Sequence, residues 1–239
     1  MIKNGIDVSE WQGNIAWGEV AKHVDFAILR AGYGRLASQV DKCFHSYYSR
    51  AKAAGVKLGA YWYSYAKSAD EAKLEAAACL EVLKGKQFEY PIYFDVEEQA
   101  TLALGRETVS AIINAFCAEL EKAGYFVGLY MSANPLTNIT TEQVKKRYAI
   151  WVANYGVSKP NYSGSYGMWQ RSSQGRVNGI TGNVDIDESY QDYPAIIKAN
   201  GLNGFPKPEQ PKPQEPPKKS IKITVEYDDR IFSGLLEER

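Results

Sequence analysis

The feature that most constrains the fold is a repeated alternation of short apolar segments with amphipathic ones. The apolar, strand-like segments are residues 5–9, 25–34, 56–65, 90–97, 125–132, 148–155, 166–173 and 183–189. Between the earlier ones lie 39–55, 68–85 and 105–124, which have apolar positions at helical spacing and each end on Gly. Alternating strands and helices predict a parallel α/β domain. Because helices are missing between the last strands, we expect an irregular, barrel-like α/β domain rather than an open doubly wound sheet.

The last part of the chain has a different composition. Residues 206–219, "PKPEQPKPQEPPKK", are typical of an extended, semi-rigid linker. Residues 220–239 follow, with apolar side chains in alternation and Asp228-Asp229 as a turn, which predicts a β-hairpin. A lone hairpin is not independently stable, so it either packs on something or is a frayed tail. We therefore expect a barrel in 1–205, a linker, and a short wall-binding or oligomerising tail.

Composition excludes several classes of function. The formal net charge is zero, which gives no support for nucleic acid as a partner. The three cysteines, Cys43, Cys79 and Cys117, form no C-x-x-C pair, and no glycine-rich phosphate loop follows a strand. We expect no metal and no cofactor. No apolar run has the length of a membrane span, so membrane insertion is not expected.

The segment "YPIYFDVEE", residues 90–98, ends an apolar strand in carboxylates. Asp95 and Glu97 are two positions apart, so their side chains leave the strand on the same face. Two close carboxylates separate their pKa values, which suits acid–base hydrolysis. A solvated strand end is the plain alternative.

More carboxylates lie near other predicted strand ends: Asp7 in "GIDVSEWQG", and Asp185 with Asp187 in "GNVDIDES". The carboxyl ends of barrel strands meet on one rim, where catalytic groups collect. Aromatic side chains occupy equivalent positions, and stacking on sugar rings is their functional interpretation, with core packing as the alternative. The expected substrate-binding set is Tyr33, Tyr63, Tyr130, Trp151, Trp169, Gln170 and Asp187.

Three of these segments resemble the signatures of the glycoside hydrolase family 25 muramidases, in the family's order. They are "GIDVSEWQG", "YPIYFDVEE" and "MWQRSSQGRVNGITGNVDIDES", and the resemblance covers about residues 3–194. It implies a flattened, irregular (β/α) barrel resembling a TIM barrel. It also implies cleavage of the β-1,4 bond between N-acetylmuramic acid and N-acetylglucosamine in bacterial peptidoglycan, with net retention.

The resemblance also implies site roles. Glu97 matches the family's proton donor, and Asp95, Asp7 and Asp185 match its other conserved carboxylates. Asp187 occupies a position where the family usually has Asn. The identity of the nucleophile stays open. Either a carboxylate of the enzyme or the substrate's own 2-acetamido oxygen attacks the anomeric carbon. The rival classes are a catalytically inactive wall-binding protein, which would lose the acid, and a metal-dependent deacetylase or phosphodiesterase, which would need His/Asp clusters.

The start, "MIKNGIDVSEWQG", shows no classical signal peptide. Because peptidoglycan lies outside the cytoplasmic membrane, the resemblance implies a phage endolysin that passes from the host cytoplasm to the wall. A bacterial autolysin or toxin that acts outside the cell is the alternative. Self-association through the tail is a further expectation.

Overall fold

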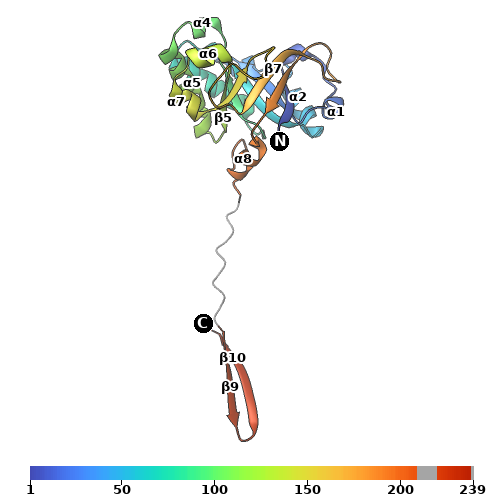
Figure 1. Ribbon diagram of the computed structural model, residues 1–239, viewed down its shortest axis with the longest axis vertical. Helices are drawn as coiled ribbons and strands as arrows, with labels where there is room; N and C mark the ends of the chain where they lie inside the picture. Colours follow the sequence, from blue (N-terminus) through green and yellow to red (C-terminus); the bar gives the residue numbers. More distant parts are fainter. Residues whose placement is uncertain (209–219, 238–239) are drawn as a thin grey trace. The chain divides into compact units, whose positions relative to one another are not determined.

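A computed structural model describes residues 1–208 and 220–237 (Figure 1). The chain divides into two compact units, Met1–Pro208 and Glu209–Arg239, and each is described by itself. Most of the expected linker, residues 209–219, lies outside the described residues.

The first unit is a closed barrel of eight strands in chain order. The strands are β1 (Lys3–Val8), β2 (Phe26–Tyr33), β3 (Lys57–Tyr63), β4 (Ile92–Asp95), β5 (Val127–Ser132), β6 (Ala149–Ala153), β7 (Met168–Gly175) and β8 (Val184–Ser189). Neighbours from β1 to β7 pair in parallel, whereas β8 runs antiparallel to both β7 and β1. The reversal of β8 brings its first residues to the rim where the other strands end.

Helices cover the outside of the barrel (Figure 1). They are α1 (Trp17–Val20), α2 (Phe44–Ala53), α3 (Ala69–Leu83), α4 (Gln99–Leu102), α5 (Arg106–Lys122), α6 (Ala133–Asn138), α7 (Glu142–Arg147) and α8 (Tyr193–Ala199), with short 3₁₀ turns η1 (Glu10–Gln12) and η2 (Ala37–Gln39). Phe94 of β4 stacks on Phe116 of α5 with ring centroids 3.9 Å apart. The side-chain oxygen of Ser68 caps α3 by accepting a hydrogen bond from the Glu71 amide.

The inside of the barrel changes from apolar at its base to acidic at its mouth. At the base, Phe26 stacks on Tyr90, and Tyr193 of α8 packs at a tilt against Tyr90 and edge-on against Phe126. These contacts close the amino-terminal end of the strands with α8. Gly5 leaves the space that the Phe26 ring fills, since a Cβ there would stand 2.4 Å from it. The acidic side chains lie at the opposite end of the barrel.

The second unit is a hairpin of β9 (Ser220–Tyr227) and β10 (Arg230–Glu237). Asp228 and Asp229 join the strands, and both have positive φ, at 50° and 57°. Two left-handed residues in a two-residue loop are the mark of a type I′ turn, whose twist matches that of the strands. The expected irregular α/β barrel and the expected hairpin are thus confirmed.

Candidate active site

A cavity of about 200 Å³ opens at the carboxyl-terminal mouth of the barrel. Its lining residues are Asp7, Tyr61, Asp95, Glu97, Tyr130, Trp151, Tyr155, Gln170 and Asp185. All four carboxylates that the sequence marked as catalytic therefore meet in one place. They come from β1, from β4 and its following loop, and from β8, where Asp185 pairs in register with Asp7.

Gln170 of β7 connects opposite sides of this cavity. Its Nε2 donates to Asp7 Oδ2 at 2.6 Å, and its Oε1 accepts from the hydroxyl of Tyr130 at 2.7 Å. The hydroxyl of Tyr155 donates to the same Oε1. Both ends of the amide are engaged, so its orientation and that of Asp7 are fixed before substrate arrives.

Asp187 lies one layer below Asp185 and does not line the cavity. It is fully buried, and its Oδ1 accepts from the indole nitrogen of Trp151 at 2.9 Å. Its Oδ2 has no hydrogen-bond partner among the described residues. Burial, followed by the charge of Asp185, raises the pKa of Asp187 well above its usual value. Burial and then the charge of Asp187 raise the pKa of Asp7 well above its usual value in the same way.

Glu97 is the more exposed member of the D-x-E motif. It follows the end of β4 and is partly exposed, whereas Asp95 is buried with Oδ1 unpartnered among the described residues. Burial and then the charges of Asp185 and Glu98 raise the pKa of Glu97. Burial and then Glu97 raise the pKa of Asp95, which Arg30 opposes. Burial also raises the pKa of Asp185 to about 6.

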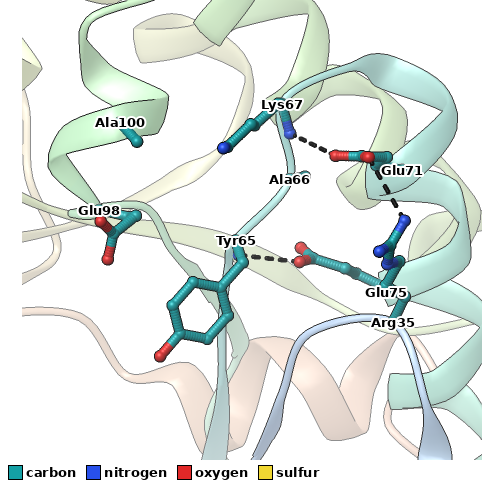
Figure 2. A pocket seen from close by; sticks show the side chains of 8 residues that line it. All are labelled: Arg35, Tyr65, Ala66, Lys67, Glu71, Glu75, Glu98 and Ala100. Carbon is teal, nitrogen blue, oxygen red and sulfur yellow. Dashed lines mark hydrogen bonds and ion pairs between the residues drawn. The ribbon is translucent and has the colours of Figure 1, made fainter.

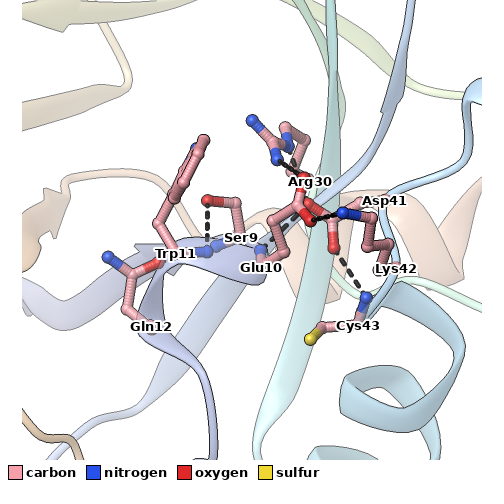
Figure 3. Close-up of polar contacts among 8 residues, drawn as sticks. All are labelled: Ser9, Glu10, Trp11, Gln12, Arg30, Asp41, Lys42 and Cys43. Atoms are coloured by element: carbon pink, nitrogen blue, oxygen red, sulfur yellow. Dashed lines mark hydrogen bonds and ion pairs between the residues drawn. The ribbon is translucent and has the colours of Figure 1, made fainter.

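Arg30 of β2 fastens the loop after β1 beside these carboxylates (Figure 3). Its Nε donates to Asp41 Oδ2 at 2.7 Å, and a terminal nitrogen donates to Glu10 Oε1 at 2.9 Å. Asp41 also accepts from the Glu10 amide at 3.0 Å and from the Cys43 amide at 2.8 Å. This network joins the η1 turn, β2 and the start of α2, so the loop that follows Asp7 is rigidly placed.

Three exposed aromatic side chains stand on the same rim. They are Trp11 in η1, Tyr65 just after β3 and Tyr155 just after β6, at 79%, 48% and 45% exposure. Every other Phe, Tyr and Trp side chain within residues 1–208 is buried or partly buried. Each of the three exposed side chains follows the carboxyl end of a barrel strand by two or three residues, so the exposed aromatic surface of the barrel is concentrated at its mouth.

The structure divides the predicted substrate-binding residues into three groups. Tyr130, Trp151 and Gln170 line the cavity. Tyr33 and Tyr63 are partly buried beside it, each packed against Tyr65.

Trp169 and Asp187 are buried away from the cavity. The indole of Trp169 donates to the carbonyl of Asn154 in the helix-facing core. Trp169 and Gln170 are adjacent in β7, and neighbouring strand residues face opposite sides, so the two cannot both point inward. The sequence interpretation missed Tyr61 and Tyr155. Strand alternation from Tyr63 would have found Tyr61.

A second cavity lies beside the mouth, between the loop after β3, α3 and α4 (Figure 2). Its buried carboxylate is Glu75, which accepts from the hydroxyl of Ser64 at 2.7 Å and from the amide of Tyr65 at 2.8 Å. These bonds hold the loop that presents Tyr65. Burial raises the pKa of Glu75 to about 7, against the lowering effect of the Ser64 hydrogen bond.

We expect Glu75→Gln to stabilise the barrel at pH 8 but not at pH 5. A carboxyl whose folded pKa is raised favours folding below its unfolded pKa of about 4.5, and that contribution is lost as pH rises to about 7. A shift of this size corresponds to about 3 kcal/mol, or roughly 10 °C in melting temperature. Thermal unfolding of both proteins at the two pH values measures it. The same difference in melting temperature between variant and parent at pH 5 and at pH 8 would contradict the account.

Comparisons with known proteins support one family. The model of the glycosyl hydrolases family 25 matches residues 6–180. An autolytic lysozyme of Clostridium acetobutylicum is 32% identical over 185 residues, which are 77% of this chain and 55% of that protein. This chain thus spans about half the length of that lysozyme.

Two solved structures share the barrel. The CTP1L endolysin aligns with a TM-score of 0.74 and 26% identity over 83% of this chain and 70% of that one. The modular autolysin LytC of Streptococcus pneumoniae, solved with a synthetic peptidoglycan ligand, aligns with a TM-score of 0.68 and 30% identity over 79% of this chain and 47% of that one. With the family model covering most of the barrel, the chain belongs to family 25 of the glycosyl hydrolases.

Proposed function

We propose that this chain is a peptidoglycan muramidase. It cleaves the β-1,4 bond between N-acetylmuramic acid and N-acetylglucosamine. The observation that carries the proposal is a partly exposed glutamate, Glu97, held above buried carboxylates at the open end of a family 25 barrel. The relatives named as lysozyme, endolysin and autolysin support the same activity, and LytC was solved with a peptidoglycan ligand.

Glu97 acts as the general acid. Glycoside hydrolysis needs a proton on the leaving oxygen, from a group whose pKa lies near the working pH. Burial and the neighbouring charges of Asp185 and Glu98 raise the pKa of Glu97 in that direction. Its partial exposure allows it to reach a bound glycan.

Asp185 and Asp95 stabilise the positive charge that develops on the sugar ring. Asp185 is the more accessible of the two, and its pKa of about 6 leaves it largely ionised at neutral pH. Both routes to the intermediate use this pair: direct attack by a carboxylate, or attack by the substrate's own 2-acetamido oxygen with a carboxylate orienting the amide. Net retention of configuration follows from either route.

Asp7, Gln170 and Asp187 are positioning residues. Gln170 ties Asp7 to Tyr130 and Tyr155, and Asp187 ties the cavity floor to Trp151. Together they fix the carboxylate side chains in place without requiring contact with the glycan.

The glycan strand lies across the rim formed by Trp11, Tyr65 and Tyr155. Sugars present C–H faces that stack on aromatic rings, and these side chains are exposed, unlike Trp151 and Trp169. The rim replaces the buried tryptophans as the main binding platform.

We expect Trp11→Ala to raise KM for peptidoglycan about fivefold with little change in kcat or melting temperature. Loss of one stacked ring makes the free energy of glycan binding less favourable by about 1 kcal/mol. The control is Leu74→Ala, which removes an exposed apolar side chain of α3. Steady-state kinetics on solubilised glycan strands measure the effect. Unchanged KM for the Trp11 variant would contradict the platform.

The proposed activity is tested by the loss of turbidity of purified bacterial walls together with release of reducing sugar. We expect both to proceed in parallel. Loss of turbidity without reducing ends would indicate cleavage of peptide or amide bonds and would overturn the proposal.

The proposed place of action is the bacterial cell wall. Its partner there is the peptidoglycan glycan strand, reached by release from a phage-infected host cytoplasm or by export from a bacterium. Within the described residues, no helix combines the length and apolar character needed to cross a membrane.

A further inference from the structure

Both faces of the hairpin carry exposed apolar side chains, and one face is apolar along the whole of β9, with no described residue of its own unit covering it. Ile221, Ile223, Val225 and Tyr227 of β9 project to this face, and Phe232 of β10 joins them opposite Val225. Their exposed fractions range from 41% to 73%. A two-stranded hairpin is marginal in water, and three or more strands are needed for independent stability. The hairpin therefore needs a partner.

Among the described residues, the outer edge of β9 pairs with no other strand. The type I′ turn closes on Tyr227 and Arg230, so those residues form a hydrogen-bonded pair across the hairpin. Hydrogen-bonded pairs alternate along an antiparallel ladder. The backbone amides and carbonyls of Lys222, Thr224 and Glu226 consequently point away from β10.

We propose that two copies of this chain pair through these β9 edges. The strands run antiparallel, with the two-fold axis at Thr224. In this register Lys222 of each copy lies opposite Glu226 of the other, which places opposite charges side by side on one face. On the other face, Ile223 meets Val225 of the second copy, and Ile221 meets Tyr227. The result is one four-stranded sheet.

Other registers and the other edge lack this complementarity. A shift of the two-fold axis to Val225 places Lys222 opposite Asp228 but Glu226 opposite Thr224. Pairing through β10 with the axis at Ser233 would set Ile231 opposite Leu235, with no opposite charges in these positions. The β9 register about Thr224 pairs every charged side chain between Ile221 and Tyr227 with its opposite.

Pairing has a consequence for wall binding. Two barrels joined in this way bind a polymeric substrate with higher avidity than one, without any new contact to the glycan. The proposal does not depend on the muramidase activity, because it concerns the hairpin alone.

The mass of the full chain in solution tests the proposal. Light scattering after gel filtration should give twice the monomer mass of 26.7 kDa. Lys222→Glu or Glu226→Lys alone places two like-charge pairs in the dimer and should raise its dissociation constant at least about tenfold. The double reversal Lys222→Glu with Glu226→Lys should restore dimerisation. Melting of the barrel is the folding control for each variant.

A single cysteine tests the register. In a hydrogen-bonded antiparallel pair the Cα atoms are about 5.5 Å apart, which suits a disulfide. Thr224→Cys should form a covalent dimer under mild oxidation, with a 224–224 link in peptide maps. The matched control is Ser233→Cys, at the β10 position opposite Thr224, which should not form one.

Two results would overturn the proposal. One is a monomer at every concentration tested, and retention of that monomer on purified walls would assign the apolar face to the wall polymer. The other is a dimer that the charge variants leave unchanged and that Thr224→Cys does not crosslink beyond Ser233→Cys.

Discussion

Replacing Glu97 by Gln should lower kcat for wall lysis about 100- to 10,000-fold while leaving the melting temperature nearly unchanged. Gln keeps the shape of the side chain but has no proton to transfer to the leaving oxygen, and general acids contribute about this much to the rate. The loss should appear in kcat more than in KM, because the side chain acts chiefly in the transition state.

The neighbouring carboxylate provides the control. Glu98 accepts a hydrogen bond from the hydroxyl of Tyr63 at 3.3 Å and does not line the mouth cavity. Glu98→Gln should therefore keep activity within a few-fold of the parent. Comparable losses in both variants would point to a general electrostatic effect, and near-full activity of Glu97→Gln would show that another group is the acid.

Replacing Trp151 by Ala should destabilise the barrel by about 3–5 kcal/mol. The side chain is 1% exposed and packs against Tyr61, Tyr93 and Tyr130, with ring centroids 4.5–6.3 Å apart. Truncating a buried aromatic leaves a cavity, and costs of this size follow. It also removes the indole N–H that Asp187 accepts from. Thermal and denaturant unfolding measure the loss.

Trp151→Phe separates the two effects. Phe fills much of the space but has no donor for Asp187, so the loss of stability should be smaller, while the pH dependence of kcat should move with the freed carboxyl. If Trp151→Ala instead unfolded like the parent and only raised KM, Trp151 would be a glycan platform rather than a core residue.

Much of the barrel is predictable from local pattern. Every strand from β1 to β8 overlaps one of the predicted apolar segments, although β1 begins two residues before its segment and β7 ends two residues after. The helices α2, α3 and α5 lie in the amphipathic stretches that end at Gly. The signals are local because a barrel strand is buried on both faces and its helices are buried on one. The antiparallel course of β8 is not predictable in this way, since strand direction depends on the length and path of the connection.

The candidate site is predictable to the level of its carboxylates but not of its aromatics. Asp7, Asp95, Glu97 and Asp185 lie together because each is at the mouth end of a strand or just beyond it. Strand alternation separates the inward-facing Gln170 from Trp169, but no local pattern shows which aromatic side chains a loop presents to solvent at the mouth. Trp169 faces the helix-side core, whereas Trp11 is presented to solvent by a turn that Arg30, Asp41 and Glu10 hold in place.

The most direct test of the central claim is the identity of the sugar at the new reducing ends of digested peptidoglycan. Purified walls are treated with the full chain, the released fragments are reduced with borohydride, and the reduced end of each fragment is identified by mass spectrometry. The account predicts reduced N-acetylmuramic acid, and none of it with Glu97→Gln. Reduced N-acetylglucosamine as the main product, or muramic ends that persist in the Glu97 variant, would contradict it.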